Sequence, residues 1–198
     1  MRTEILSFSS RRNGNCDAIA AYIASLTRGA VHCFSAMHPN PCGHCAYECF
    51  HSADDCPHIH DGVRLLYETV LRADMVYYLV PNYCDFPCAN FFIFQERGQC
   101  CFQGAGEKER AYLAVPKRFI VVSNTGEEHF RAAFREHVQG APDVLFLAAE
   151  AYGRVSIDGD LLRADAAREA VRAFVQRSGP QETAGERQAP TNRPFVWL

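Results

Sequence analysis

Along most of the chain, short apolar runs alternate with segments in which apolar residues recur at the three- and four-residue spacing of a helix. The runs expected to form strands are residues 3–8, 30–34, 75–80, 119–122 and 144–149. After the first run, apolar side chains recur at the spacing that places them on one side of a helix, at Ile19, Tyr22, Ile23 and Leu26. Further stripes begin at Val63, Phe130 and Ala167. This order predicts a parallel sheet covered by helices.

The third strand and the helix after it are the most apolar part of the pattern. Residues 75–80 are apolar throughout, which is typical of a central parallel strand, and we expect Pro81 to end it. Pro87 suits the first turn of a helix that runs to Arg97. Four consecutive apolar residues, 91–94, make that helix apolar nearly all round, so we expect it to be buried or to form a subunit contact.

Five strands and five helices in strict alternation predict an α/β fold of the flavodoxin-like, doubly wound type. The expected five-stranded parallel sheet has the order 2-1-3-4-5, with helices on both faces. We assign residues 1–178 to this single domain.

Three segments do not follow the pattern. Residues 35–60 are rich in Cys and His and show neither the helical nor the strand spacing of apolar residues. They are expected to form an irregular loop. Residues 98–116 form a connection that is longer than usual. Residues 179–198 are too polar to build a core and indicate a flexible tail. The tail nevertheless ends in the apolar residues Phe195, Val196, Trp197 and Leu198. This tip either docks on a protein surface or is a chance apolar sequence at the terminus.

Composition and charge exclude several classes of function. The 198 residues include 20 basic and 23 acidic side chains, a formal net charge of -3, so nucleic-acid binding is not expected. The longest apolar run, residues 18–24, is far shorter than the roughly 18 residues of a membrane-spanning helix. The first residues show no export signal, so we expect a cytoplasmic protein without membrane partners.

Ten cysteines in a reducing compartment suggest a metal or redox role rather than a disulfide scaffold. Four thiolates can hold a [4Fe-4S] cluster or, with lower expectation, a tetrahedral zinc ion. A loop of reduced thiols without metal is the structural alternative. The candidate metal ligands are Cys42, Cys45, Cys49 and Cys56, and the nearby histidines are more typical of surface residues.

Three loops should carry the site, because a doubly wound sheet binds ligands outside the carboxyl ends of its strands, where the strand order reverses. The first, residues 7–16, offers hydroxyls, amides, an arginine and a helix start, which suits a phosphate; a plain polar turn is the alternative. The second, residues 81–87, has an aromatic residue that can stack on a planar group. The third, residues 123–126, is small and polar.

Together these loops resemble those of the NADPH-dependent FMN reductase family. The family's phosphate motif, Gly-Ser-Pro-Arg-x-x-Gly-Asn-Thr, is matched at Ser9, Arg11, Gly14 and Asn15, with Phe8, Ser10 and Cys16 in place of Gly, Pro and Thr. Its second motif, Pro-x-Tyr and a proline-rich turn into a helix, is similar to residues 81–97.

The resemblance implies an NAD(P)H-dependent oxidoreductase with non-covalent FMN and a quinone, flavin or similar small-molecule acceptor. The chemistry would be centred on the flavin, with no catalytic side chain. Members of the family usually form dimers or tetramers, so the resemblance also implies a homo-oligomer. The residues implied for the FMN phosphate are Ser9, Arg11, Asn13, Asn15 and Cys16. Those implied for the ring are Pro81, Asn82, Tyr83, Cys84, Asp85, Asn124, Thr125 and Gly126.

The cysteine pattern also resembles that of the iron-sulfur flavoproteins, a subgroup with a compact four-cysteine motif after the second strand. An electron carrier that exchanges electrons with a ferredoxin-like protein is therefore a second interpretation. A third is an interaction module that has kept the fold and lost the cofactor, which the departures at Phe8, Ser10 and Cys16 favour.

Overall fold

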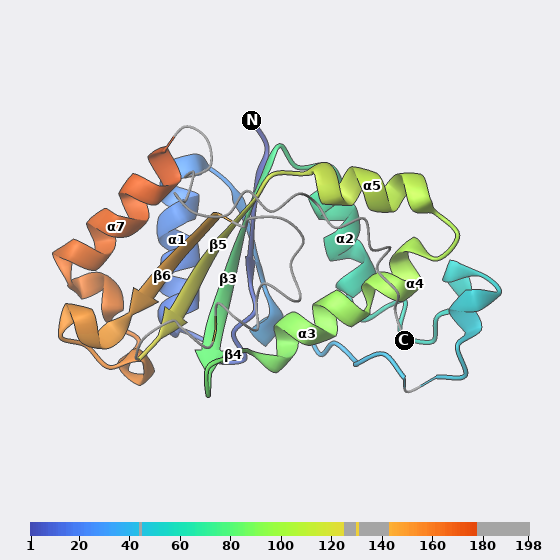
Figure 1. Ribbon diagram of the computed structural model, residues 1–198, viewed down its shortest axis with the longest axis horizontal. Helices are drawn as coiled ribbons and strands as arrows, with labels where there is room; N and C mark the ends of the chain where they lie inside the picture. The colour runs from blue at the N-terminus through green and yellow to red at the C-terminus, as the bar shows by residue number, and fades with distance from the viewer. Residues whose placement is uncertain (44, 125–129, 131–142, 178–198) are drawn as a thin grey trace.

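The structure is a computed structural model that describes residues 1–198 except 44, 125–129, 131–142 and 178–198. Its centre is a parallel sheet in the order β2-β1-β3-β5-β6, which corresponds to the predicted order of five parallel strands. The strands are β1 (Thr3–Ser7), β2 (Ala30–Cys33), β3 (Met75–Tyr83), β5 (Lys117–Ser123) and β6 (Asp143–Ala148). The prediction of a doubly wound α/β sheet is confirmed (Figure 1).

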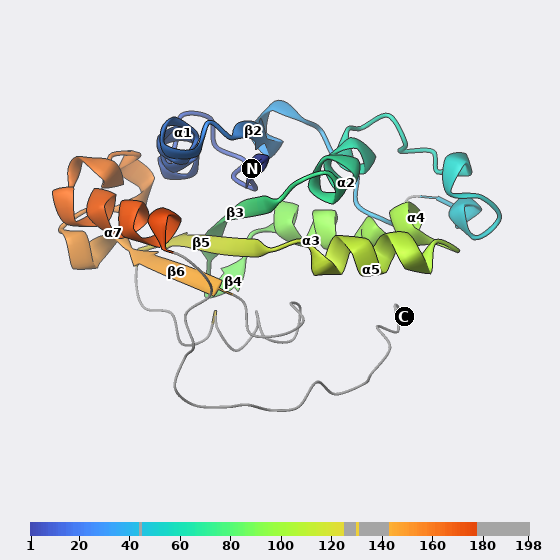
Figure 2. The same cartoon turned by 90° about the horizontal axis from the view of Figure 1, so that it is seen from above.

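Helices cover both faces of this sheet. The helices are α1 (Asn15–Thr27), α2 (Val63–Leu71), α3 (Ala89–Glu96), α4 (Gly98–Phe102), α5 (Gly106–Ala114) and α7 (Asp165–Gln176). In Figure 1, α1 and α7 lie on one side of the sheet, and α2, α3 and α5 lie on the other; Figure 2 shows the same layers from above.

Alternation along the strands divides the core in two. Ile5 and Tyr77 pack with α1 and α7, whereas their neighbours Leu6 and Tyr78 pack with α2, α3 and α5. Successive side chains of a strand point to opposite faces, so strands with apolar residues at every position supply both layers. The second layer is rich in aromatic rings.

The end of β3 differs from the prediction. We expected Pro81 to end the strand, but β3 continues to Tyr83 and turns back into β4 (Phe86–Pro87), an antiparallel partner. Cys84 and Asp85 have φ values of 51° and 65°, the left-handed pair that a two-residue hairpin needs. Pro87 therefore belongs to the hairpin, and α3 begins two residues later than the proline rule suggested.

The long connection at residues 98–116 is also more regular than expected. It forms α4 and α5, because Cys100, Cys101 and Tyr112 are buried against the aromatic layer. These few apolar residues do not recur at a helical spacing, and α5 is otherwise rich in charged residues. The hydrophobic pattern therefore does not predict either helix. Within the cysteine loop, residues 35–60, the described part contains only short 3-10 turns.

Two other predictions fall largely outside the described residues. Of the helix expected near residues 130–138, only Phe130 is described; it is buried, with its ring centroid 5.8 Å from that of Phe146. The tail at 179–198, with its apolar tip, lies outside them entirely. No helix in the described part of the chain is long and apolar enough to cross a membrane.

Candidate functional site

The candidate site lies at the carboxyl ends of β1 and β3, where the strand order reverses. The loop after β1, residues 8–14, lies beside β3 and the start of α3, because the Phe8 backbone amide donates to the Leu79 carbonyl at 3.0 Å and the Asn90 side-chain amide donates to the Phe8 carbonyl at 2.9 Å. This is the edge at which doubly wound sheets bind ligands.

Phe8 occupies the position where the family motif has glycine. Its side chain is fully buried and contacts Phe34, Tyr78, Phe91 and Phe94, with ring centroids 4.8–5.4 Å apart. The ring therefore points into the core and away from the loop, so that its bulk does not fill the candidate site.

The start of α1 offers backbone donors. Gly14 is the N-cap and supplies no side chain, and Asn13 before it has a φ of 58°. Uncapped amides at the end of a helix of this length favour an anion. One internal anion is already close: the Asp17 carboxylate accepts from the Ser7 hydroxyl at 3.1 Å and from the Asn13 amide at 2.9 Å.

The residues predicted to bind the phosphate are brought together here, and several have internal partners. The Ser9 hydroxyl accepts from the Arg11 amide at 3.1 Å. The thiol of Cys16 is buried, and this burial, the largest cause, raises its pKa, so it remains protonated and uncharged. The Asn13 backbone amide donates to the Asp17 carboxylate.

A segment after β6 completes the site, and sequence reasoning missed it. The Arg11 guanidinium donates to the Ile157 carbonyl at 2.6 Å. The Asn15 amide group donates to the Ser156 carbonyl at 2.8 Å and accepts from the Leu161 amide at 2.9 Å. Asn15 therefore acts as a brace between α1 and residues 156–161 rather than as a free donor.

The signal that could have revealed this segment is a glycine. Gly159 has a φ of 74°, and a Cβ added there would lie 3.3 Å from the Asn13 carbonyl oxygen. This is a close backbone approach in a conformation that L residues rarely adopt, which is the setting that demands glycine.

The hairpin forms the other wall. The Asn82 side-chain amide donates to the Ser123 hydroxyl at 2.9 Å, while its buried Oδ1 has no hydrogen-bond partner within the described structure. Tyr83 is 48% exposed, and partial burial, with the nearby Cys88 and Cys16 thiols, raises its pKa against an opposing effect of Arg11. Cys84 is exposed at the tip, beside half-buried Asp85, and Pro81 is buried in β3.

The third predicted loop is only partly described. Asn124 accepts from the Ser156 amide through its side-chain oxygen at 2.7 Å and from the Glu150 amide through its carbonyl at 3.1 Å. It thus ties the end of β5 to the segment after β6. Thr125 and Gly126 lie outside the described residues.

The predicted metal ligands lie elsewhere, on the side of the molecule that carries α4. Cys42, Cys45, Cys49 and Cys56 belong to the cysteine loop, and Cys49 and Cys56 are buried. Cys100 of α4 joins them, because it interacts electrostatically with Cys42, Cys49 and Cys56. Burial raises the pKa of each of these three loop thiols. From the sequence pattern, Cys100 is expected only as a thiol of the long connection at residues 98–116.

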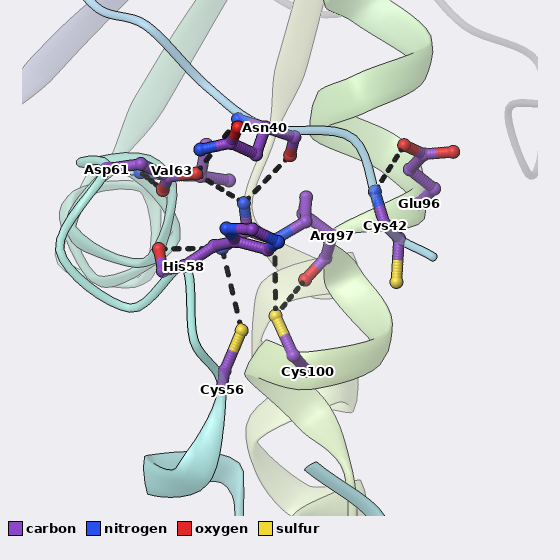
Figure 3. A network of polar contacts seen from close by, with 9 residues as sticks. All are labelled: Asn40, Cys42, Cys56, His58, Asp61, Val63, Glu96, Arg97 and Cys100. Carbon is purple, nitrogen blue, oxygen red and sulfur yellow. Dashed lines mark hydrogen bonds and ion pairs between the residues drawn. The ribbon is translucent and has the colours of Figure 1, made fainter. Parts of the chain in front are cut away.

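Arg97 organises this thiol cluster, as Figure 3 shows. Its guanidinium is 1% exposed and pairs with Asp61. Burial lowers the pKa of the Arg97 guanidinium, but the hydrogen bond to Asp61 raises it by more, so the net pKa of Arg97 is raised. The Cys101 thiol and the Arg97 guanidinium both stabilise a charged Cys100 and lower the pKa of its thiol. Within the described residues, however, no group of three or more His, Cys, Asp or Glu side chains is arranged to hold a metal ion.

Comparisons with known proteins agree with the fold. No protein-family model matches the sequence, and no curated protein matches it. Among solved structures, the Trp repressor binding protein from Bacillus subtilis is similar with a TM-score of 0.62 and 13% identity, over 90% of this chain and 100% of that one. The flavoenzyme NAD(P)H:(acceptor) oxidoreductase FerB from Paracoccus denitrificans is similar with a TM-score of 0.52 and 18% identity, over 88% of this chain and 94% of that one.

A third solved structure, the apo form of the NADH:FMN oxidoreductase EMOB, is similar with a TM-score of 0.51 and 12% identity, over 88% of both chains. At these identities the likeness establishes architecture rather than activity. The chain has the flavodoxin-like α/β fold.

Proposed function

We propose that the protein is an FMN-dependent oxidoreductase that takes electrons from NAD(P)H and passes them to a quinone, flavin or similar small-molecule acceptor. The observation that carries the proposal is the juxtaposition of an uncapped α1 start, the Arg11 guanidinium and the Tyr83 hairpin at the strand-order switch. Two similar structures are described as NAD(P)H- or NADH-dependent flavin enzymes, which supports the same class.

The residues present fit FMN. The backbone amides at the start of α1, together with Ser9 and Arg11, would hold the phosphate, since amide and guanidinium donors suit its oxygens. The Oδ1 of Asn82, which has no partner among the described residues, and the half-exposed ring of Tyr83 would face the flavin. When bound, FMN supplies hydride and electron transfer, and the protein supplies position and electrostatics.

This chain's own residues would orient the cofactor rather than move protons. Asn15 and Asn124 hold the segment at residues 156–161 against the β1–α1 loop, so the shape of the phosphate site depends on that brace. The exposed apolar residues Tyr83, Phe86, Val155 and Ile157 belong to the two segments that border the site, and suit a planar, weakly polar acceptor. We further propose a cytoplasmic homo-oligomer, a dimer or tetramer.

A cofactor-free interaction module is the second candidate, and one observation favours it. The Asp17 carboxylate already accepts from the Ser7 hydroxyl and the Asn13 amide, so a negative charge stands beside the place proposed for a phosphate. The iron-sulfur electron carrier requires iron at Cys42, Cys45, Cys49 and Cys56, and the arrangement of the described thiols does not fit a metal as it stands.

The test is to titrate the purified, full-length protein with FMN and follow flavin fluorescence, with iron and zinc assayed on the same sample. Arg11→Ala should weaken FMN binding about 10- to 100-fold, the effect of losing one charged hydrogen bond. Arg12→Ala is the matched control, because among the described residues its guanidinium donates only to the Ser35 carbonyl, at 3.3 Å. FMN binding by this variant should stay within about threefold of wild type.

Wild-type protein that is folded by circular dichroism but binds no FMN would overturn the proposal in favour of the interaction module. About four irons per chain would favour the electron carrier. With FMN bound, NADPH and NADH oxidation in the presence of a quinone then tests the donor and the acceptor.

A further inference from the structure

We propose that Cys56 and Cys100 form a reversible disulfide that fastens the cysteine loop to α4. The site is distinct from the candidate flavin site and does not depend on the proposed function. It is built from two segments that lie 44 positions apart in the sequence, the end of the cysteine loop and α4.

Arg97 places these two segments against each other. Its Nη1 donates to the Asn40 carbonyl at 2.9 Å and pairs with the Asp61 carboxylate, and its Nη2 donates to the His58 carbonyl at 3.1 Å. Asn40 and His58 lie in the cysteine loop on either side of Cys56, and Asp61 follows directly after the loop. Because Arg97 immediately precedes α4, its side chain holds Cys56 close to Cys100 before any bond forms.

The two sulfur atoms share the guanidinium. The Nε of Arg97 is 3.5 Å from the Cys100 sulfur, and its Nη2 is 3.9 Å from the Cys56 sulfur. The two thiols also interact electrostatically with each other. Figure 3 shows both sulfurs on the same side of the guanidinium and next to each other.

Cys101 and Cys42 are less suitable partners for Cys100. Cys101 is its neighbour within helix α4, and although the two thiols interact, a disulfide between adjacent helical residues would distort the backbone. Cys42 is held by a different contact, because its amide donates to Glu96 at 2.7 Å, and Figure 3 shows it on the far side of Arg97 from Cys56.

The reaction is a two-electron exchange with a low-molecular-weight disulfide. The Cys56 and Cys100 thiols each give up one hydrogen as an electron and a proton, and a sulfur–sulfur bond forms between them. The sulfur–sulfur bond of the small disulfide breaks and takes up both electrons and both protons, which yields two small thiols. A small dithiol reverses the exchange.

The experiment treats full-length protein with oxidised glutathione or with reduced dithiothreitol, quenches it in acid, and alkylates free thiols after denaturation. Peptide mapping by mass spectrometry of the oxidised sample should show a Cys56–Cys100 link and eight rather than ten alkylated cysteines, against ten in the reduced sample. Closing so long a loop should raise the melting temperature by roughly 8–16 °C.

Three variants sharpen the result. Cys56→Ser and Cys100→Ser should each abolish the link and the rise in melting temperature, whereas Cys84→Ser, which removes an exposed thiol of the hairpin, should leave both unchanged. The proposal is overturned if fully oxidised wild type keeps ten free thiols, if a different pair is linked, or if untreated protein carries iron or zinc that these two serine variants release. Because the mapping is done on the wild type, the test stands even if a variant fails to fold.

Discussion

The sharpest test of the fold is Phe8→Ala. Phe8 follows β1 at the position where the family motif has glycine, yet its ring is fully buried. Removing a buried phenylalanine ring costs about 3–5 kcal/mol, from lost transfer free energy and the cavity that remains. Four neighbouring rings meet Phe8 at centroid distances of 4.8–5.4 Å, three of them edge-on or tilted beyond 50°, so we expect the upper part of that range.

A loss of about 4 kcal/mol is a large fraction of the 5–15 kcal/mol that typically separates folded from unfolded protein. For a chain of this length it corresponds to a fall in melting temperature of roughly 8–16 °C, and to a fall of about 1–2 M in the urea midpoint. The assay is urea unfolding followed by circular dichroism and tyrosine fluorescence, with the slope of the transition compared between variants.

Two control variants separate the effect of a buried ring from the effect of removing any phenylalanine. Phe86→Ala removes a ring that is 56% exposed and should change the free energy of unfolding by less than about 0.5 kcal/mol. Phe8→Leu keeps most of the volume and should cost less than about 2 kcal/mol. A loss below about 1 kcal/mol for Phe8→Ala, at unchanged slope, would refute the placement of this ring in the core.

Two further predictions concern ionic groups. Arg118 is 5% exposed, pairs with Asp143 at 3.0 Å and donates to the carbonyls of Phe174 and Arg177 at the end of α7. Arg118→Met should therefore lower the free energy of unfolding in urea by about 3–5 kcal/mol. Arg168→Met, on the exposed face of α7, should lower it by less than about 0.5 kcal/mol. Burial lowers the pKa of Lys117 from 10.5 to about 8, so between these pH values the unfolded chain binds more protons than the folded one and stability rises with pH. The free energy of unfolding of wild type minus that of Lys117→Met should therefore increase from pH 8 to 10.5; a flat difference would contradict a buried amine.

The order of the elements and the candidate loops could be read from the sequence. Apolar runs predicted the five parallel strands of the described residues, and the central strand β3 has the most continuous run because a strand buried on both faces must be apolar. Since parallel strands need crossover helices, the order of elements then restricted the sheet topology. The position of the site followed from that topology.

Tertiary contacts decided the rest. The sequence could not show that the Phe8 ring turns into the core, that Asn15 braces a segment 141 positions away, or that β3 runs through Pro81 into a hairpin. Each depends on a partner distant in the chain, for which local pattern carries no signal. The same holds for Cys100, which joins the cysteine loop only because a buried guanidinium needs several acceptors and finds them on both segments.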